Sequence, residues 1–447
     1  MRDEIKKISK IVSQAGGTAY LVGGCVRDMI LGFEPKDFDI EVYGISQESL
    51  VSLLSEYSLD LVGKSFGILK IKGMPIDVSL PRREQQIGTG HKDFKVICDP
   101  KMTFVEASNR RDFTINTLMY NPLTEKFLDP TGRGMGDLTN KILDPVSEAF
   151  KEDSLRVLRA MQFIARFGFS PSEKLIEFSK SLTMNDLPSE RVFEEFNKLI
   201  LKGVFIGKGL DFLVQSTWIR FFPELQAIQN VEQDPIHHPE GKVLFHTGCV
   251  LDAFAKNRSG NDEEDLVMGY ACLCHDLGKA THTQWNEKGN GKWTAYGHEE
   301  AGEAPTRSFL GKLTNQNELV ESVVPLVKHH LKPRLFFKGK SSKSAIRRLA
   351  LEVNIEQLCQ INKFDRLGRP PLCPTEFPEI DWLINLANDC GVKNEKPKMI
   401  VAGKDLIKLG MKPGPELGVL LKKLFQMQLD GGFETVEAGI LIAESLI

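Results

Sequence analysis

The residues whose types suit chemistry first appear near the N-terminus, where a glycine pair is followed by two aspartates. Gly23 and Gly24 directly precede an expected helix that carries Arg27. Glycine lets the backbone approach a phosphate closely, and the start of a helix offers free N–H groups. Asp37 and Asp39 stand two apart on an expected strand, so both carboxylates face one side and can share divalent metal ions. This combination predicts two-metal phosphoryl transfer. A surface turn beside a solvated acidic strand is the alternative.

Three further segments carry polar side chains that could serve the same chemistry. Asp77 could be an extra metal ligand or the base for an attacking hydroxyl, or it could end a strand in solvent. Arg111, Asp112 and Asn116 lie in NRRDFTIN, where arginines suit contacts to a triphosphate and its ribose. A salt bridge at the start of a buried helix would look the same. The Gly-rich residues 83–99 are typical of a loop, either a catalytic lid or a passive connector.

Ordered motifs over roughly residues 18–205 resemble those of the class II tRNA nucleotidyltransferases. The motifs are YLVGGCVRD with KDFDIEV, RRDFTINTL, FLDPTGRGMGDL, KEDSLRVLRAMQFIARFG and LPSERVFEEFNKLI. This family comprises the CCA-adding enzymes, which are close kin of the bacterial poly(A) polymerases. The resemblance implies an α/β head with a polymerase-β-like nucleotidyltransferase sheet. It also implies tRNA, CTP and ATP as partners, and addition of CCA to tRNA 3′ ends without a nucleic-acid template.

The resemblance also implies roles for the residues of the head. The catalytic aspartates of the family fall on Asp37 and Asp39, which would hold Mg²⁺ ions that activate the RNA 3′-OH and neutralise the triphosphate. Gly23, Gly24 and Arg27 would cradle that triphosphate. Contacts to the ribose, and coupling of the head to the helices that follow, fall on Arg111, Asp112 and Asn116.

The base-reading motif of the family, EDxxR, falls on residues 152–156, with Arg159 one turn further along. Asp153 and Arg156 are three residues apart, so on a helix they would project side by side. An Asp accepts from the amino group that C and A share, and an Arg donates to the neighbouring ring nitrogen. Because U and G carry the inverse pattern, such a protein edge selects C and A. A plain salt bridge along the helix is the alternative.

A second group of residues predicts a metal-dependent hydrolase. His246, the pair His275 and Asp276, and the distant Asp365 have the spacing of the HD phosphohydrolase superfamily. They resemble the HD domain that is fused to some bacterial CCA-adding enzymes. Histidine and carboxylate ligands suit Ni²⁺, Mn²⁺, Co²⁺ or Mg²⁺, and a bound metal would supply hydroxide to a phosphate ester.

Three further histidines, His298, His329 and His330, match additional positions of that domain and could serve a second metal or hold substrate phosphate. The resemblance implies 2′,3′-cyclic phosphodiesterase, 2′-nucleotidase and phosphatase activity. Histidines packed in the core of apolar helices are the alternative.

The elements that must position these residues change in type along the chain. Residues 1–145 alternate strands with helices and form the expected nucleotidyltransferase head, and helical periodicity dominates from about residue 146. We therefore expect a helical neck at 146–235 that binds the nucleotide base and RNA, an HD domain at 236–370, and a C-terminal helical region at 371–447. For the last region we expect contact with the tRNA body or packing in a dimer. The expected strands are Ala19–Val22, Asp39–Val42, Ile68–Ile71, Ile76–Ser79 and Glu125–Leu128.

Composition excludes several classes of protein. The 447 residues have a formal net charge of −3, so the chain as a whole is not a basic nucleic-acid binder, although local basic patches could bind RNA. No apolar run approaches the roughly 20 residues of a membrane span, and the charged N-terminus lacks the features of a secretory signal. The eight cysteines form no CxxC pair, which predicts reduced thiols and a cytoplasmic protein. The sequence leaves open whether the protein is a monomer or a homodimer.

Three alternative functions remain open from the sequence. A poly(A) polymerase is disfavoured by the HD residues and by the absence of a strongly basic C-terminal tail. An enzyme that adds only A or only CC would share most motifs, although the loop at 83–99 argues against CC addition alone. An HD hydrolase with an RNA-binding head is disfavoured by Asp37, Asp39, Asp153 and Arg156.

Overall fold

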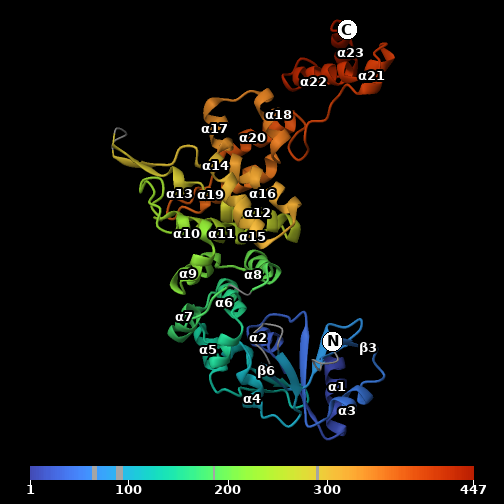
Figure 1. Cartoon of the computed structure of the whole chain (residues 1–447), viewed down its shortest axis with the longest axis vertical. Helices are drawn as coiled ribbons and strands as arrows, with labels where there is room; N and C mark the ends of the chain where they lie inside the picture. The colour runs from blue at the N-terminus through green and yellow to red at the C-terminus, as the bar shows by residue number, and fades with distance from the viewer. Residues whose placement is uncertain (63–67, 87–93, 185–186, 288–290) are drawn as a thin grey trace. The chain divides into compact units, whose positions relative to one another are not determined.

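The computed structural model describes residues 1–62, 68–86, 94–184, 187–287 and 291–447. The chain forms two compact units, Met1–Phe221 and Phe222–Ile447 (Figure 1). The division between the two units, after Phe221, falls before the expected boundary at 235/236. No described helix is long and apolar enough to cross a membrane.

A seven-stranded mixed sheet forms the head, as the expected α/β fold requires. Its strands, in spatial order, are β3 (Leu59–Val62), β4 (Ile68–Ile71), β5 (Ile76–Ser79), β2 (Phe38–Tyr43), β1 (Thr18–Val22), β8 (Met119–Asn121) and β9 (Lys126–Leu128). β2 runs parallel to β5, and the other neighbouring strands are antiparallel. All five expected strands are present, with boundaries shifted by at most a residue. β3 and β8 were not expected.

The structure corrects the prediction of a loop at 83–99. β6 (Arg82–Gln86) and β7 (Phe94–Cys98) pair as an antiparallel hairpin. Polar and glycine residues around these strands hid the alternation in the sequence. The segment between them, 87–93, lies outside the described residues, and so does the predicted choice between lid and connector.

Helices complete the first unit on both sides of the site. They are α1 (Arg2–Gln14), α2 (Gly24–Ile30), α3 (Gln47–Leu53), α4 (Phe104–Asn109), α5 (Gly134–Asn140), α6 (Leu155–Phe167), α7 (Glu173–Lys180), α8 (Ser189–Lys202) and α9 (Ile206–Gln215), with short 3₁₀ turns at Thr114–Asn116, Glu148–Glu152 and Trp218–Phe221. A two-stranded pair, β10 (Ile142–Leu143) and β11 (Ser170–Pro171), lies in the same unit. Burial of Val157, Leu158, Met161 and Ile164 gives α6 the predicted apolar face, which packs against α8 and α9. α6 thereby becomes a fixed platform for the residues at its start.

The second unit is mainly helical. Its helices are α10 (Pro223–Ile228), α11 (Val243–Ala255), α12 (Asp262–Cys274), α13 (Lys279–His282), α14 (His298–Ala301), α15 (Glu303–Leu313), α16 (Asn317–His329), α17 (Lys332–Gly339), α18 (Lys343–Glu352), α19 (Ile355–Leu367) and α20 (Pro378–Asp389). α12 packs against α11, α16 and α19 and is buried along most of its length. The ends of these four helices carry the candidate ligands.

The sequence at 286–292 is rich in Asn and Gly, and no strand was expected there. In the structure, β12 (Gln284–Asn286) and β13 (Lys292–Thr294) form an antiparallel pair in which Trp285 and Trp293 are cross-strand partners. Residues 288–290 lie outside the described part.

The C-terminal helices α21 (Gly403–Lys408), α22 (Pro415–Leu429) and α23 (Val436–Glu444) surround a small core of their own. Residues 409–414 separate α21 from α22. Arg347 and Arg348 of α18 form ion pairs with Glu434 and Asp430. These two arginines are therefore paired within the protein.

One buried carboxylate ties the sheet to the segment that follows α4. Glu41 of β2 is 1% exposed and accepts from Tyr43 Oη at 2.7 Å. Arg110 and Arg111 reach the same carboxylate at 2.8 and 3.3 Å. Burial opposes ionisation of Glu41, but the two guanidinium groups outweigh it and lower its pKa. The arginines of the RRD motif are thus partly neutralised from inside the head.

We predict that Glu41→Gln lowers the free energy of unfolding by about 3 kcal/mol or more, because two arginines would lose their buried counter-charge. Since the pKa of Glu41 is lowered on folding, its contribution is present above the ordinary value and is lost as the pH falls. Urea unfolding of the full chain at pH 7 and pH 4 measures both effects. Glu125→Gln, which removes an exposed pair with Lys6, is the control and should change little. Equal stability of both variants would contradict the assignment.

Candidate active sites

A polar pocket in the first unit brings together most residues predicted for nucleotide chemistry. Its lining includes Gly23, Gly24, Asp39, Arg111, Asp112, Asn116, Asp153, Arg156 and Arg159. Three predicted residues, Asp37, Asp77 and Arg27, do not line it. Sequence reasoning missed Arg191 of α8, which does. Its motif, LPSERVFEEF, was recognised, but no role followed from the position alone.

The candidate metal carboxylates come from neighbouring strands. Asp39 of β2 is the register partner of Asp77 on the parallel strand β5. Asp37 lies on the exposed bend before β2 begins, so the expected pair on one strand is wrong for this residue. Burial raises the pKa of Asp39; Arg111 opposes the rise, and the charges of Asp77 and Asp37 add to it. Carboxylates that repel one another in this way fit a hard divalent cation such as Mg²⁺.

The three carboxylates lie further apart than the ligand atoms of a compact metal site. Within the described residues they form no group whose ligand atoms all lie within 4.8 Å of one another. Asp77 also pairs with Lys70 at 3.5 Å. Such an open arrangement leaves coordination positions for other oxygens, as Mg²⁺ sites that use substrate phosphates require.

The glycine pair is shaped for close approach. Gly23 caps α2 with a φ of 76°, a conformation that side chains rarely adopt. A Cβ there would lie 3.2 Å from Arg111 Nη1, and a Cβ on Gly24 would lie 3.4 Å from Arg27 Nη2. The absence of side chains at the two glycines therefore leaves space between two guanidinium groups and Asp39. We call the backbone of Gly23 and Gly24 at this space the glycine floor.

Arg27 is a buried residue that supports the glycine floor. Only 4% of it is exposed, and it donates to Asp28 at 2.7 Å and to Asn116 Oδ1 at 2.7 Å. Its guanidinium carbon lies 5.0 and 4.8 Å from the ring centroids of Phe163 and Phe167 on α6. Arg27 therefore joins α2 to α6.

Asp112 is the centre of a second buried network. It accepts from Asn116 Nδ2 at 2.8 Å, from its neighbour's backbone N–H at 2.8 Å, and from Arg159 at 2.7 Å. Burial opposes ionisation of Asp112, yet Arg159 and Asn116 lower its pKa. The network fixes Arg159 of α6 against the segment that carries the RRD motif.

The two predicted base-reading residues lie at the start of α6, with one difference from expectation. Asp153 precedes the helix in extended conformation and caps it, since its Oδ1 accepts from Leu155 N at 3.0 Å. Its Oδ2 accepts from Arg191 at 3.0 Å. Arg156, in the first turn, donates to the carbonyls of Ala149 and Arg110. The two residues thus face one pocket without pairing with each other.

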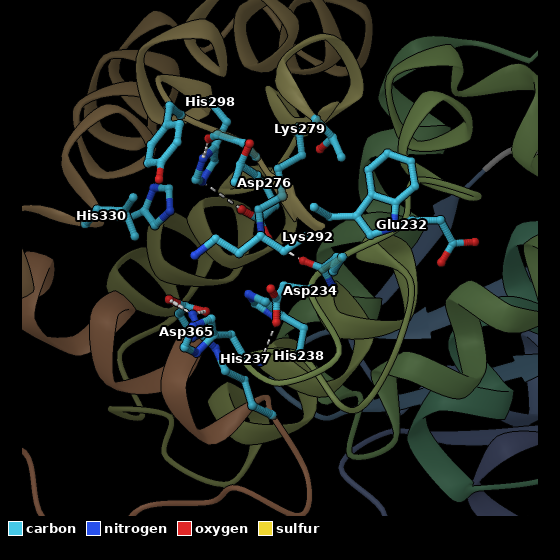
Figure 2. Close-up of a pocket in the computed structure, with 18 of the residues that line it drawn as sticks. Glu232, Asp234, His237, His238, Asp276, Lys279, Lys292, His298, His330 and Asp365 are labelled. Carbon is cyan, nitrogen blue, oxygen red and sulfur yellow. Dashed lines mark hydrogen bonds and ion pairs between the residues drawn. The ribbon is translucent and has the colours of Figure 1, made fainter. Parts of the chain in front are cut away.

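The second unit holds a pocket around a buried cluster of histidines and carboxylates (Figure 2). His246 lies on α11, Asp365 on α19, and His275 and Asp276 at the end of α12. His298 begins α14, and His330 follows α16. The ligand atoms form two compact groups: His246, His275 and Asp365, and Asp276, His298 and His330, each within 4.8 Å.

Backbone carbonyls orient three of these imidazoles. The Nδ1 atoms of His275, His298 and His330 lie 2.8, 2.6 and 2.7 Å from carbonyl oxygens three residues earlier. A carbonyl only accepts, so each Nδ1 carries the proton and each Nε2 keeps a lone pair. This is the arrangement that second-shell partners impose on metal-binding histidines.

The Nε2 atoms of His275 and His298 are buried without a hydrogen-bond partner, and each lies 3.2 Å from a carboxylate oxygen of Asp276. Lone pairs that face a carboxylate repel unless a cation lies between them. These residues therefore fit a divalent metal, and their mixed nitrogen and oxygen donors suit a transition metal as well as Mg²⁺.

Two cations hold the carboxylates in place. Lys279 contacts Asp276 at 2.8 Å, and Arg369 contacts Asp365 at 2.6 Å. Burial opposes ionisation of both aspartates, but neighbouring groups outweigh it, Lys279 among them at Asp276 and Arg369 at Asp365, so both pKa values lie well below the usual range.

His329 does not join the cluster, although its neighbour does. Its Nε2 lies 2.9 Å from Glu352 on α18, and no candidate ligand group contains it. Successive residues at a helix end point in different directions, so only one of the pair can face the pocket.

Sequence reasoning missed His238 and Glu240, which lie just after the expected domain boundary at 235/236. Glu240 Oε1 accepts from His238 Nδ1 at 2.8 Å and from His246 Nδ1 at 2.7 Å, and its side chain is fully buried. Burial opposes ionisation of Glu240, but these two hydrogen bonds lower its pKa to about 2. Since His246 turns its other nitrogen, Nε2, to Asp365 at 3.1 Å, Glu240 supports a ligand rather than forming a separate metal site.

Comparisons with known proteins agree with this geometry. Residues 19–144 match the family described as the poly A polymerase head domain. The multifunctional CCA protein of Xylella fastidiosa strain 9a5c is 33% identical over 325 residues, which cover 70% of this chain and 74% of the relative. That of Xanthomonas campestris pv. campestris strain B100 is 30% identical over 420 residues, 90% of this chain and 95% of the relative. The chain belongs to the multifunctional CCA protein family.

Solved structures show that the CCA protein fold extends along the whole chain. The CCA-adding enzyme of Bacillus stearothermophilus in complex with CTP has a TM-score of 0.67 at 19% identity, covering 98% of this chain and 96% of that chain. The Thermotoga maritima CCA-adding enzyme complexed with tRNA has a TM-score of 0.61 at 18% identity, with coverages of 99% and 95%. The expected fold, an α/β head followed by a largely helical body, is confirmed.

For this CCA protein, we predict that Glu240→Gln weakens Mn²⁺ binding about 10- to 100-fold, because an outer carboxylate sets the orientation and basicity of His246. Isothermal titration calorimetry on the metal-stripped full chain measures the dissociation constant. Glu352→Gln is the matched control, since it removes the carboxylate beside His329 outside the cluster. Unchanged affinity in Glu240→Gln would show that the carboxylate does not support a ligand.

Proposed function

We propose that this CCA protein adds CCA to tRNA 3′ ends from CTP and ATP in the pocket of the first unit, and that a second metal-dependent site hydrolyses phosphate esters. One observation supports the first activity above the others. Asp39, the glycine floor and Asp153 with Arg156 line a single pocket, although they come from distant parts of the sequence.

One end of that pocket would bind the metal ions and the triphosphate. Asp37 and Asp39, with Asp77 beside them, would hold Mg²⁺, which when bound neutralises the triphosphate and favours ionisation of the attacking 3′-OH. The backbone of Gly23 and Gly24 approaches the phosphates, and Arg111 donates to them.

The other end of the pocket selects the base. Asp153 accepts from the amino group shared by C and A, and Arg156 donates to the adjacent ring nitrogen. The ion pair with Arg191 and the cap of α6 hold the Asp153 carboxylate in one orientation, while its remaining lone pairs stay available. Because α6 and α8 hold the groups that contact the base, the selection of C and A needs no nucleic-acid template.

We predict that Asp39→Asn lowers the rate of nucleotide addition by more than about a hundredfold. A residue that only supports a metal ligand would cost less than this when it is replaced. tRNAs ending before C74, after C74 or after C75 are incubated with labelled CTP or ATP separately, and incorporation is followed on gels. Wild-type protein should stop at CCA. Long A tracts on unrelated RNA would identify a poly(A) polymerase, A-only incorporation an A-adding enzyme, and no incorporation a hydrolase with an RNA-binding head.

The cluster of the second unit carries the hydrolase proposal. His246, His275, Asp276 and Asp365 would hold the metal, with His298 and His330 on the side that faces Asp276. The metal, when bound, lowers the pKa of a water molecule and polarises the phosphate. Lys279 and Arg369 keep the carboxylates ionised and oriented. The reactions that we assign to this site are hydrolysis of 2′,3′-cyclic phosphates, 2′-phosphates and other phosphate monoesters.

We predict that His275→Ala abolishes metal-dependent hydrolysis of 2′,3′-cyclic AMP and leaves CCA addition within about twofold of wild type, since the two sites lie in separate units. Product release is followed by chromatography. His282→Ala, which removes an exposed histidine outside the ligand groups, serves as the control. Loss of both activities in His275→Ala would argue against two independent sites.

A further inference from the structure

We propose that α17 carries a surface of the second unit that binds the phosphate backbone of RNA. The surface consists of Arg334 and Lys338 of the helix and Lys340, the residue that ends it. We call these three residues the α17 surface. The inference rests on the proposed function in one respect, because RNA is the polyanion on which the protein is proposed to act.

The sequence around α17 is strongly one-sided in charge. Between His330 and Glu352 there are seven cations and no carboxylate, whereas the chain as a whole has a net charge of −3. A local run of one sign produces a potential that the average charge of the protein hides. The cations are Lys332, Arg334, Lys338, Lys340, Lys343, Arg347 and Arg348.

Packing within the protein engages four of these seven cations. The three on α18 form ion pairs with acidic side chains outside that helix. Lys332 lies over the ring of Phe336, 5.8 Å from its centroid. The side chains of Arg334, Lys338 and Lys340 have neither an ion pair nor a ring contact among the described residues. These three positive charges are therefore available to a partner.

The three free cations are exposed and lie along the helix. Arg334 and Lys338 are four residues apart, so their side chains lie next to one another on α17. Lys340 follows one turn later, where the chain leaves the helix with a φ of 46°. With a rise of 1.5 Å per residue, the row from Arg334 to Lys340 is about 9 Å long.

Apolar contacts hold α17 in place. The helix packs against α20 (Figure 1). Pro333 is buried, and the ring of Phe337 meets that of Trp382 edge-on, with centroids 5.8 Å apart and planes at 70°. The helix that carries the cations is thus fixed before a partner binds, which lowers the entropy that binding costs.

The composition of α17 favours RNA over an anionic membrane. A helix that lies in a membrane surface buries a broad apolar face. The exposed apolar residues of α17 are Leu335 at 48% and Phe337 at 37%, and Phe337 already contacts Trp382. An RNA strand presents a phosphate at every nucleotide and needs only cations in a row. The α17 surface therefore fits an RNA backbone and carries no group that would read a sequence through paired donors and acceptors.

The test is RNA binding by the full chain, followed by fluorescence polarisation of labelled tRNA ending in CCA over a range of KCl concentrations, without CTP or ATP. Lys338→Ala/Lys340→Ala should raise the Kd roughly tenfold near 0.1 M salt and reduce the slope of log affinity against log salt by about 1.5, because two phosphate contacts are lost. Arg334 stays intact in this variant because it also lines the hydrolase pocket.

Two further variants separate phosphate contacts from folding and from net charge. Lys338→Arg/Lys340→Arg keeps both charges and should bind RNA as wild type does. Lys343→Ala/Lys398→Ala is the matched control, since it removes the same charge from two exposed lysines of the same unit that are already paired with acidic side chains. Its Kd and salt slope should equal those of wild type. Equal losses in the two Ala double variants would overturn the proposal.

The remaining outcomes judge the partner and the proposed function separately. Losses of the same size on tRNA and on an unrelated hairpin RNA are expected, because phosphate contacts carry no sequence information. A loss on one RNA alone would overturn the backbone assignment. An unchanged Kd for RNA, together with weaker binding of Lys338→Ala/Lys340→Ala to phosphatidylglycerol vesicles, would assign the surface to a membrane instead. Wild-type protein that binds RNA through α17 but adds no CCA would overturn the proposed function and support the surface.

Discussion

The buried carboxylates of Glu41, Asp112 and Asp276 each have a cation beside them, and both sites depend on these pairs. Glu41 is paired with Arg110 and Arg111, Asp112 with Arg159, and Asp276 with Lys279. An unpaired buried charge would cost several kcal/mol, so every such carboxylate fixes the element that brings its partner. In the first unit these pairs join the sheet to α6. In the second they leave the Nε2 atoms of His275 and His298 without a hydrogen-bond partner.

Short motifs predicted the placement of functional groups well where each motif holds those groups within a few residues. Gly23 with Gly24, and His275 with Asp276, fall where their spacing puts them. Prediction was weaker where a side chain's direction depends on long-range packing. Arg27 has the right position for a phosphate, yet it is buried against Phe163 and Phe167.

Local composition also misled the sequence reading in identifiable ways. Asp153 was placed on a helix, but an Asp whose carboxylate caps a helix must precede it. The polar stretch at 286–292 hid a hairpin, although tryptophans on either side, at 285 and 293, are a usable sign of cross-strand pairing. His238 and Glu240 were overlooked because nearby prolines indicated a domain boundary. Their two-residue spacing beside His246 was the available signal.

The main-chain carbonyls that hold His275, His298 and His330 have an evolutionary consequence. Each acceptor lies three residues before its histidine, within the same short segment, so no other side chain is required to set the ring. Neighbouring positions can therefore vary without disturbing the direction of the lone pairs. A ligand set built in this way tolerates sequence drift around it, and lineages could alter the surrounding pocket, and hence the substrate, while the metal chemistry is retained.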